Sequence, residues 1–214
     1  MELVGRGLRA LRRSASWWGV GIGFLVLVSV AFWPSLEGSE ALTELEEMGE
    51  VMEVFGAQDM DTSAGYLDGQ LFAVMLPLLL SGMAVAGVTA VTSGDEDAGR
   101  LELLHALPVS RRAVWLGRFA AAVLALAIVT TLTAAVMALS LAPFSLSEAG
   151  VGPVVAATFA CGALGVFHAA VGFLVGAAGG RRALAVGVTV AVRVASYVVN
   201  FLVPLSDALA GARK

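Results

Sequence analysis

Apolar residues along the chain gather in five long runs, which are separated by shorter polar stretches. The runs cover about residues 17–33, 70–92, 113–142, 153–178 and 183–204. Each run is long enough to cross about 30 Å of hydrocarbon as an α-helix that rises about 1.5 Å per residue. A lone strand would leave backbone N–H and C=O groups unpaired in lipid. The pattern therefore predicts an all-α fold, a polytopic membrane helix bundle with five transmembrane helices.

The positions of the arginines predict how this bundle is oriented. Four arginines lie in the N-terminal tail, four in residues 92–119 and two in the turn at 179–182. Residues 34–69, on the opposite side, contain ten acidic residues and no lysine or arginine. Positively charged loops stay in the cytoplasm, so we expect a cytoplasmic N-terminus and an external acidic segment at 34–69. Arg213 and Lys214 would then lie outside, against this rule.

The polar stretches carry further structural signals. Residues 1–16 are predicted to form a basic interfacial helix, in which side chains such as Leu11 face lipid and the arginines face phosphates. Ser39–Phe55 has apolar residues at helical spacing and is predicted to be an amphipathic helix over the outer mouth. Pro77 lies inside the second run, where a proline should kink the helix. Residues 205–214 form a short tail after the fifth run.

The composition agrees with a membrane protein and argues against several kinds of catalysis. The chain is 58% hydrophobic and 14% charged, whereas soluble domains are about half apolar and a quarter charged. Its only lysine is Lys214, so no P-loop can bind ATP phosphates. His105 and His168 are far apart, and neither stands at ligand spacing with a cysteine or a carboxylate. We therefore predict no catalytic residue and no metal ligand, and the basic tail is too short to indicate nucleic-acid binding.

The polar stretch between the second and third runs is longer than a simple loop requires. Residues 92–119 carry eight charges, and three consecutive acidic residues from Asp95 suit the positive end of a helix. Pro108 would stop that helix, and Ser110 can cap the next one. A leucine stripe in this position can lie on the bilayer, pack on its own bundle or dock in a partner's groove. The stripe consists of Leu101, Leu104 and Leu107.

The run DEDAGRLELLHALPVSRRAVWLGRF, residues 95–119, resembles a segment of type-2 ATP-binding-cassette (ABC) exporter permeases. In that family the segment follows the second transmembrane helix and includes the coupling helix that contacts the ATPase subunit. The similarity extends to GYLDGQLFAVMLPLLLSGMAVAGV in the second run and to YVVNFLVPLSDAL at the end of the fifth. This chain departs from the family pattern around Gly99 and at His105.

The resemblance implies that the chain is the permease subunit of an ATP-driven exporter and has no catalytic activity of its own. ATP and Mg²⁺ would bind to a separate ABC ATPase subunit, and the chain itself would hold no cofactor. The cytoplasmic coupling loop would span residues 93–112, and the substrate is expected to be hydrophobic or amphiphilic. The dominance of arginine, alanine, glycine and valine, with a single lysine, indicates a GC-rich bacterial genome, and a permease of this kind would lie in the bacterial plasma membrane. The ATPase-coupling residues would be Glu96, Gly99, Leu101, Glu102, Leu103, Leu104, Leu107, Pro108, Ser110 and Arg111.

Two groups of residues inside the apolar runs suggest packing or transport roles. The first is a small-residue face for close helix approach, within the bundle or at a dimer seam, and it consists of Gly172, Gly176 and Gly180. The second surrounds a charge near the middle of the fifth run, which costs several kcal/mol in lipid, and it consists of Arg193, Ser196, Tyr197 and Asn200. This second face could line the translocation path or a subunit seam, or Arg193 could pair with a group on a helix that this sequence lacks.

The expected assembly has two such permease domains around one path, with one ATPase subunit for each. A sixth helix is expected after residue 214, because the resembling family has six spans in each domain. The rival hypothesis is a non-ABC membrane protein, either a secondary transporter or a membrane assembly factor. Ion-coupled transport usually requires carboxylates inside the membrane, and every Asp and Glu falls outside the five runs. The sequence therefore favours the exporter.

Overall fold

The computed structural model describes residues 2–37, 39, 61–92, 110–179 and 181–211. This part of the chain is helical and contains no strand. Five of its helical segments are long and apolar enough to cross a membrane, as the apolar runs predicted. In chain order the elements are α1 (Glu2–Leu36), α4 (Ser63–Leu67), the π-helix η1 (Asp68–Phe72), α5 (Met75–Val91), α8 (Arg111–Ser140), the 3-10 turn η2 (Ser147–Ala149), α9 (Val151–Gly179) and α10 (Arg182–Gly211).

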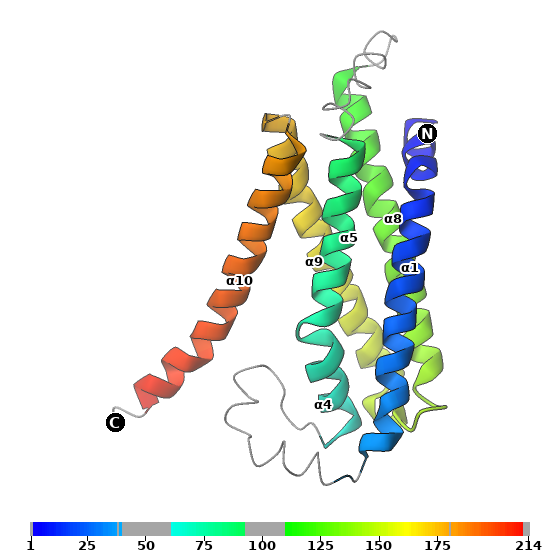
Figure 1. The fold of residues 1–214 in the computed structure, drawn as a ribbon, viewed down its shortest axis with the longest axis vertical. Helices are drawn as coiled ribbons and strands as arrows, with labels where there is room; N and C mark the ends of the chain where they lie inside the picture. The colour runs from blue at the N-terminus through cyan, green and yellow to red at the C-terminus, as the bar shows by residue number, and fades with distance from the viewer. Residues whose placement is uncertain (1, 38, 40–60, 93–109, 180, 212–214) are drawn as a thin grey trace.

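Helix α5 forms the centre of the bundle, because it packs against each of α1, α8, α9 and α10. Around it, α1 packs along α8, and α8 packs against α9. Figure 1 shows that α1, α5, α8 and α9 run side by side, whereas α10 leaves α9 at one end and diverges from the bundle. Burial of apolar side chains is therefore concentrated between α1, α5, α8 and α9.

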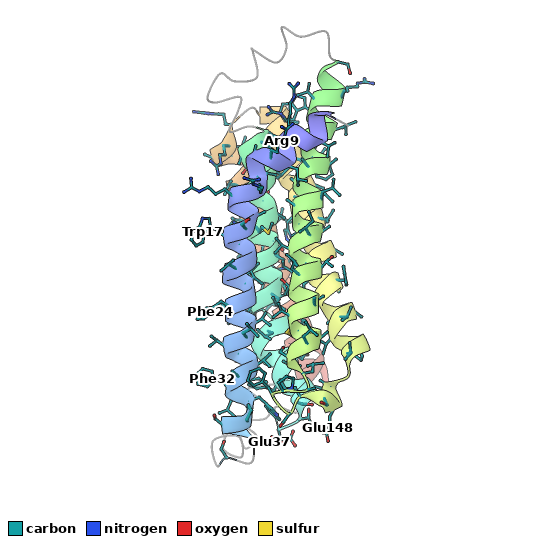
Figure 2. All side chains as sticks on the ribbon, turned by 90° about the vertical axis from the view of Figure 1, so that its right-hand side faces the viewer. Arg9, Trp17, Phe24, Phe32, Glu37 and Glu148 are labelled. Atoms are coloured by element: carbon teal, nitrogen blue, oxygen red, sulfur yellow. The ribbon has the colours of Figure 1, made fainter. Side chains whose placement is uncertain are left out.

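The two ends of the bundle differ in charge. The N-terminus, the start of α8 and the turn from α9 to α10 all lie at one end (Figure 1). Figure 2 shows Arg9 at that end, Trp17, Phe24 and Phe32 along the outer side of α1, and Glu37 and Glu148 at the opposite end. The arrangement has the order of a membrane protein, with basic residues at one end, outward apolar side chains between, and carboxylates at the other.

Helix α1 is continuous from Glu2 to Leu36, and Figure 2 shows its first turns, near Arg9, inclined to the rest. Leu11 is only 5% exposed, and a Cβ added at Gly7 would lie 2.7 Å from the Cβ of Ala121 in α8. The expectation that Leu11 faces lipid is therefore wrong, because this side of the basic segment packs on the bundle. Trp17, with 70% of its surface exposed, does point outward.

The second membrane segment is interrupted before Pro77, which confirms the predicted kink. Pro77 has no N–H to donate to the carbonyl of Ala73, and its ring crowds that carbonyl. The helix accordingly breaks at Val74, whose φ of −133° is not helical, and α5 begins at the next residue. On the other side of the break, a π-turn closes with a hydrogen bond of 2.7 Å from the N–H of Ala73 to the oxygen of Asp68.

Two helix boundaries differ from those predicted. The second membrane segment begins at Ser63 rather than at residue 70, with the hydroxyl of Thr62 accepting a hydrogen bond of 3.0 Å from the N–H of Gly65. Asp68 therefore lies inside a candidate membrane segment, near its N-terminal end, contrary to the expectation that all carboxylates fall outside. Helix α10 continues past Pro204 to Gly211, because a proline removes a single amide donor and a helix can bend around it.

Glycines of α9 allow close contact with its neighbours. A Cβ added at Gly162 would lie 2.7 Å from Cγ2 and 2.8 Å from Oγ1 of Thr130 in α8. A Cβ added at Gly165 would lie 3.2 Å from the backbone oxygen of Leu80 in α5. Such distances are shorter than ordinary van der Waals contact, so the spacing between α9, α8 and α5 depends on the missing side chains.

We expect Gly162→Ala to destabilise the bundle by about 1–3 kcal/mol, because the added methyl group overpacks the contact with stiff, β-branched Thr130. The measurement is the apparent melting temperature of the detergent-solubilised protein. Gly187→Ala in α10 is the matched control, since nothing lies within 4 Å of a Cβ at that position. Equal melting temperatures for the two variants would show that the α8–α9 contact is not limited by Gly162.

Candidate functional site

The charged strip at 92–119 is attached to two helix ends at the arginine-rich end of the bundle. Helix α5 ends at Val91, and α8 begins at Arg111. Ser110 is the N-cap of α8, and its hydroxyl accepts a hydrogen bond of 3.3 Å from the N–H of Ala113. The cap predicted for Ser110 is therefore present, and it fixes where the strip passes into the third membrane segment.

Most of the predicted coupling element lies outside the described residues, so its helix stays a prediction. The same is true of the external amphipathic helix, apart from Ser39, and of Gly180. The coupling residues concerned are Glu96, Gly99, Leu101, Glu102, Leu103, Leu104, Leu107 and Pro108.

Arg118 joins the two helices that flank the strip. Its guanidinium donates a hydrogen bond to the backbone oxygen of Val91, the last residue of α5. The last carbonyls of a helix have no donor within the helix, and a cation is favourable at that end. The bond therefore links the end of α5 to the first part of α8, the two helices between which the strip runs. Nothing in the sequence pattern singled out Arg118, because its partner is 27 residues away.

An aromatic cluster lies beside this hydrogen bond and links α8 to α9. The ring centroids of Trp115 and Phe173 are 5.8 Å apart, and those of Phe119 and Phe173 are 5.0 Å apart. Both pairs have the tilted or edge-to-face geometry that aromatic rings prefer. Helices α5, α8 and α9 are thus connected to one another near the two ends of the strip.

A cavity of about 330 Å³ lies between α5, α9 and α10, on the side where α10 diverges (Figure 1). Its walls are mainly apolar, and several polar side chains interrupt them. Ser81 comes from α5, His168 from α9, and Arg182, Thr189 and Arg193 come from α10. Each of the three helices therefore supplies at least one polar group to the same space.

Two polar groups in this cavity wall have no hydrogen-bond partner within the described part of the chain. The first is Nε2 of His168, a residue that is 1% exposed, and the second is Oγ of Ser81, which is 4% exposed. The other ring nitrogen of His168, Nδ1, lies 2.8 Å from the backbone oxygen of Leu164. The hydroxyl of Thr189 is satisfied, since it donates a hydrogen bond of 2.7 Å to the oxygen of Ala185.

The residues of the predicted polar face of α10 do not all lie at the cavity. Arg193 lines the cavity, whereas Ser196 and Tyr197 do not. The hydroxyl of Ser196 donates a hydrogen bond of 2.8 Å to the oxygen of Val192 on its own helix, and Tyr197 is 38% exposed. The side chain of Asn200 lies outside the described residues. Ser81 and Thr189, which the sequence did not single out, share the cavity with Arg193 instead.

Gly172 lies where α10 is attached to the bundle. A Cβ added there would be 3.3 Å from Oγ1 of Thr189 in α10 and 3.6 Å from Cγ1 of Val88 in α5. Gly176, one turn further along α9, is also buried. Gly172 therefore packs inside the bundle, against α5 and α10. Within the described ranges, no group of three or more His, Cys, Asp or Glu side chains could hold a metal ion.

The comparisons with known proteins agree with these features. A family model described as "ABC-2 family transporter protein" matches residues 1–213. No curated protein and no solved structure matches the chain. The matched range includes the charged strip at 92–119 and the five long apolar helices found among the described residues. The chain therefore belongs to the ABC-2 transporter family and is a multi-pass membrane permease.

Proposed function

We propose that this chain is the membrane subunit of an ATP-driven exporter in a bacterial plasma membrane, with its N-terminus in the cytoplasm. The family match over residues 1–213 carries the proposal. A separate ABC ATPase subunit would bind ATP and Mg²⁺ and hydrolyse the nucleotide. The charge difference between the two ends of the bundle supports the orientation, because arginine-rich ends are retained in the cytoplasm.

In this proposal, residues 96–111 dock on the ATPase subunit and transmit its movement. The leucine stripe supplies the apolar contact, and the connections beside the strip carry the movement into the bundle. These connections are the Arg118–Val91 hydrogen bond and the contacts of Phe173 with Trp115 and Phe119. Cores and interfaces switch between discrete packings rather than deform continuously, so a strip attached to α5 and α8, with α9 packed on α8, can move these three helices as a unit.

The translocation path would lie on the side of α10 and would be completed by a second permease domain, either a second copy or another polypeptide. Helix α10 is the least buried of the five candidate membrane segments found among the described residues. Its middle carries Arg193, which faces a cavity rather than a carboxylate. A charge at that depth is a marker of a functional pathway in membrane proteins. The substrate in this proposal is hydrophobic or amphiphilic.

The test of the proposed function is purification of the tagged chain from its native membrane. A P-loop ATPase should be retained with it, and the ATPase activity of the complex should rise when transported substrate is added. Native mass spectrometry of the same complex should show two permease domains and two ATPase subunits. A permease that retains no ATPase under mild detergent conditions would contradict the proposal and would favour a secondary transporter or an assembly factor.

Cysteine labelling in intact cells is expected to show opposite sides for Glu46 and Ala98. Glu46→Cys should react with a membrane-impermeant maleimide, and Ala98→Cys should react only after permeabilisation, because arginine-rich segments stay inside. The native Cys161 is buried and should be replaced by alanine to remove any background. External labelling of Ala98→Cys would reverse the orientation and remove the strip from the cytoplasm.

A further inference from the structure

We propose that the cavity between α5, α9 and α10 binds the polar head of an anionic amphiphile, with the anionic group at Arg193 and a neighbouring hydroxyl at His168. The cavity is the one lined by Ser81, His168, Arg182, Thr189 and Arg193. As a site for a membrane amphiphile the inference stands on its own. As the site of the transported substrate it rests on the proposed export function.

The charge of the cavity favours an anion. Among the described residues, Arg182 and Arg193 both line it, and no Asp or Glu does. No hydrogen bond or ion pair joins Arg193 to any other of the described residues. A cation near the middle of a membrane segment costs about 2.5–3.5 kcal/mol on insertion scales. A phosphate, sulfate or carboxylate group would offset this cost through charge-assisted and bidentate hydrogen bonds to the guanidinium.

Two polar atoms without a hydrogen-bond partner, one on α5 and one on α9, indicate a second chemical group that the ligand should carry. A carbonyl can only accept, so Nδ1 of His168 must carry the proton that it shares with the oxygen of Leu164 at 2.8 Å. In the neutral ring Nε2 is then an acceptor, and this buried atom, on a residue that lines the cavity, has no donor in the described part of the chain. The Ser81 hydroxyl, also unpartnered there, can donate or accept. A ligand hydroxyl beside the anionic group would satisfy Nε2.

The shape of the site suits a molecule with an apolar tail. Arg182 stands at the start of α10, and Arg193 lies eleven residues further, or about 16 Å along the helix. The cavity between them therefore runs from the membrane surface toward its middle. Its volume of about 330 Å³ is within the range of about 300–1,000 Å³ that is usual for ligand sites. The remaining wall is apolar, with side chains such as Leu78, Val186 and Val190.

A membrane amphiphile explains these features better than water or a protein carboxylate. A water molecule could donate to Nε2 of His168 but would leave the charge of Arg193 unbalanced. A carboxylate from a second permease domain could balance Arg193 but would offer no donor to Nε2. A lipid-like head that carries both a phosphate and a hydroxyl, as in phosphatidylglycerol, would satisfy both groups and place its chains against the apolar wall.

The test is native mass spectrometry of the purified full chain in detergent, titrated with phosphatidylglycerol, phosphatidic acid or phosphatidylcholine. The wild-type protein should retain phosphatidylglycerol preferentially. Arg193→Leu should weaken its binding by about 10-fold or more, whereas Arg193→Lys should keep most of it. His168→Phe should weaken binding of phosphatidylglycerol, because the head-group hydroxyl would lose its acceptor. Arg181→Leu is the control, because Arg181 is exposed and does not line the cavity.

Two results would overturn the inference. The first is unchanged phosphatidylglycerol binding in both Arg193→Leu and His168→Phe, with melting temperatures equal to that of the wild type. The second is a loss of the permease dimer in Arg193→Leu without any change in lipid binding, which would assign Arg193 to a protein carboxylate at a seam.

Reconstitution with the ATPase separates the two sources of such a ligand. A transported amphiphile should stimulate ATP hydrolysis and accumulate in the opposite leaflet, whereas a resident lipid should stay bound without transport, and either supports the site. If the ATPase is retained and active but no anionic amphiphile binds, the inference fails and the proposed function stands. If the anionic lipid binds but no ATPase is retained, the inference about the cavity stands and the proposed export function fails.

Discussion

Leu104→Asp should abolish ATP-driven transport while the permease still inserts and folds. Leu104 stands in the middle of the predicted leucine stripe, and burial of a leucine side chain at an interface contributes about 1.5–3 kcal/mol. An aspartate there would lose this contribution and add the cost of desolvating a carboxylate. Since about 1.4 kcal/mol corresponds to a factor of ten in affinity, we expect binding of the ATPase to weaken by roughly 100-fold or more.

The measurement is co-purification of the ATPase with the variant permease, followed by transport in proteoliposomes. Glu96→Arg should act in the same direction but more weakly, because it changes the charge near the predicted helix start and leaves the leucine contact intact. Lys214→Ala serves as a control for the change of −1 in net charge, since Lys214 is far from the strip in the sequence. Normal transport by Leu104→Asp would show that residues 93–109 only connect two helices and do not couple the permease to the ATPase.

Arg118→Leu should leave the ATPase bound but reduce transport by about 10-fold or more. The variant removes a hydrogen bond from a charged donor, which contributes about 1.5–3 kcal/mol, and leaves the last carbonyls of α5 without that partner. The end of α5 would then no longer be hydrogen-bonded to α8, so movement of the ATPase would no longer shift α5 and α8 together. The signature is ATP hydrolysis that continues but no longer responds to substrate.

Arg118→Lys separates charge from geometry, because a lysine keeps the charge at the helix end but has no planar guanidinium. We expect partial recovery of transport in this variant. Arg13→Leu is the matched control, since Arg13 is an exposed arginine on α1. If Arg118→Leu transports normally while its melting temperature falls, the Arg118–Val91 bond stabilises the fold and does not transmit movement.

Local features of the fold could be predicted from the sequence because each depends on neighbouring residues. The apolar runs located the five membrane segments, Pro77 located the break in the second one, and Ser110 located the start of α8. The prediction for Leu11 was wrong for a physical reason. An apolar stripe on a helix has the same periodicity whether lipid or another helix covers it, and Leu11 is covered by the bundle.

The candidate sites could be predicted only in part, because their geometry joins distant segments. The hydrogen bond from Arg118 to Val91 closes a separation of 27 residues, and helical spacing carries no information on such a pair. The cavity combines Ser81, His168 and Arg193 from three helices. Arg193 was conspicuous in the sequence because a charge in an apolar run is costly, whereas a serine or a histidine in such a run is ordinary until its neighbours are known.

Because α10 is attached to the bundle near one end, a small rotation at that end would move its other end by a large distance. Among the α10 residues whose burial is described, up to residue 202, the buried ones are Ala185 and Thr189 in the first turns, and most apolar side chains that follow are exposed. The stretch from Thr189 to Gly211 is roughly 33 Å long at about 1.5 Å per residue. A rotation of about 10° at the Gly172–Thr189 contact would therefore displace the far end by roughly 6 Å. Few packed side chains would have to separate during such a swing, so the free-energy cost would be small compared with moving any helix at the centre of the bundle.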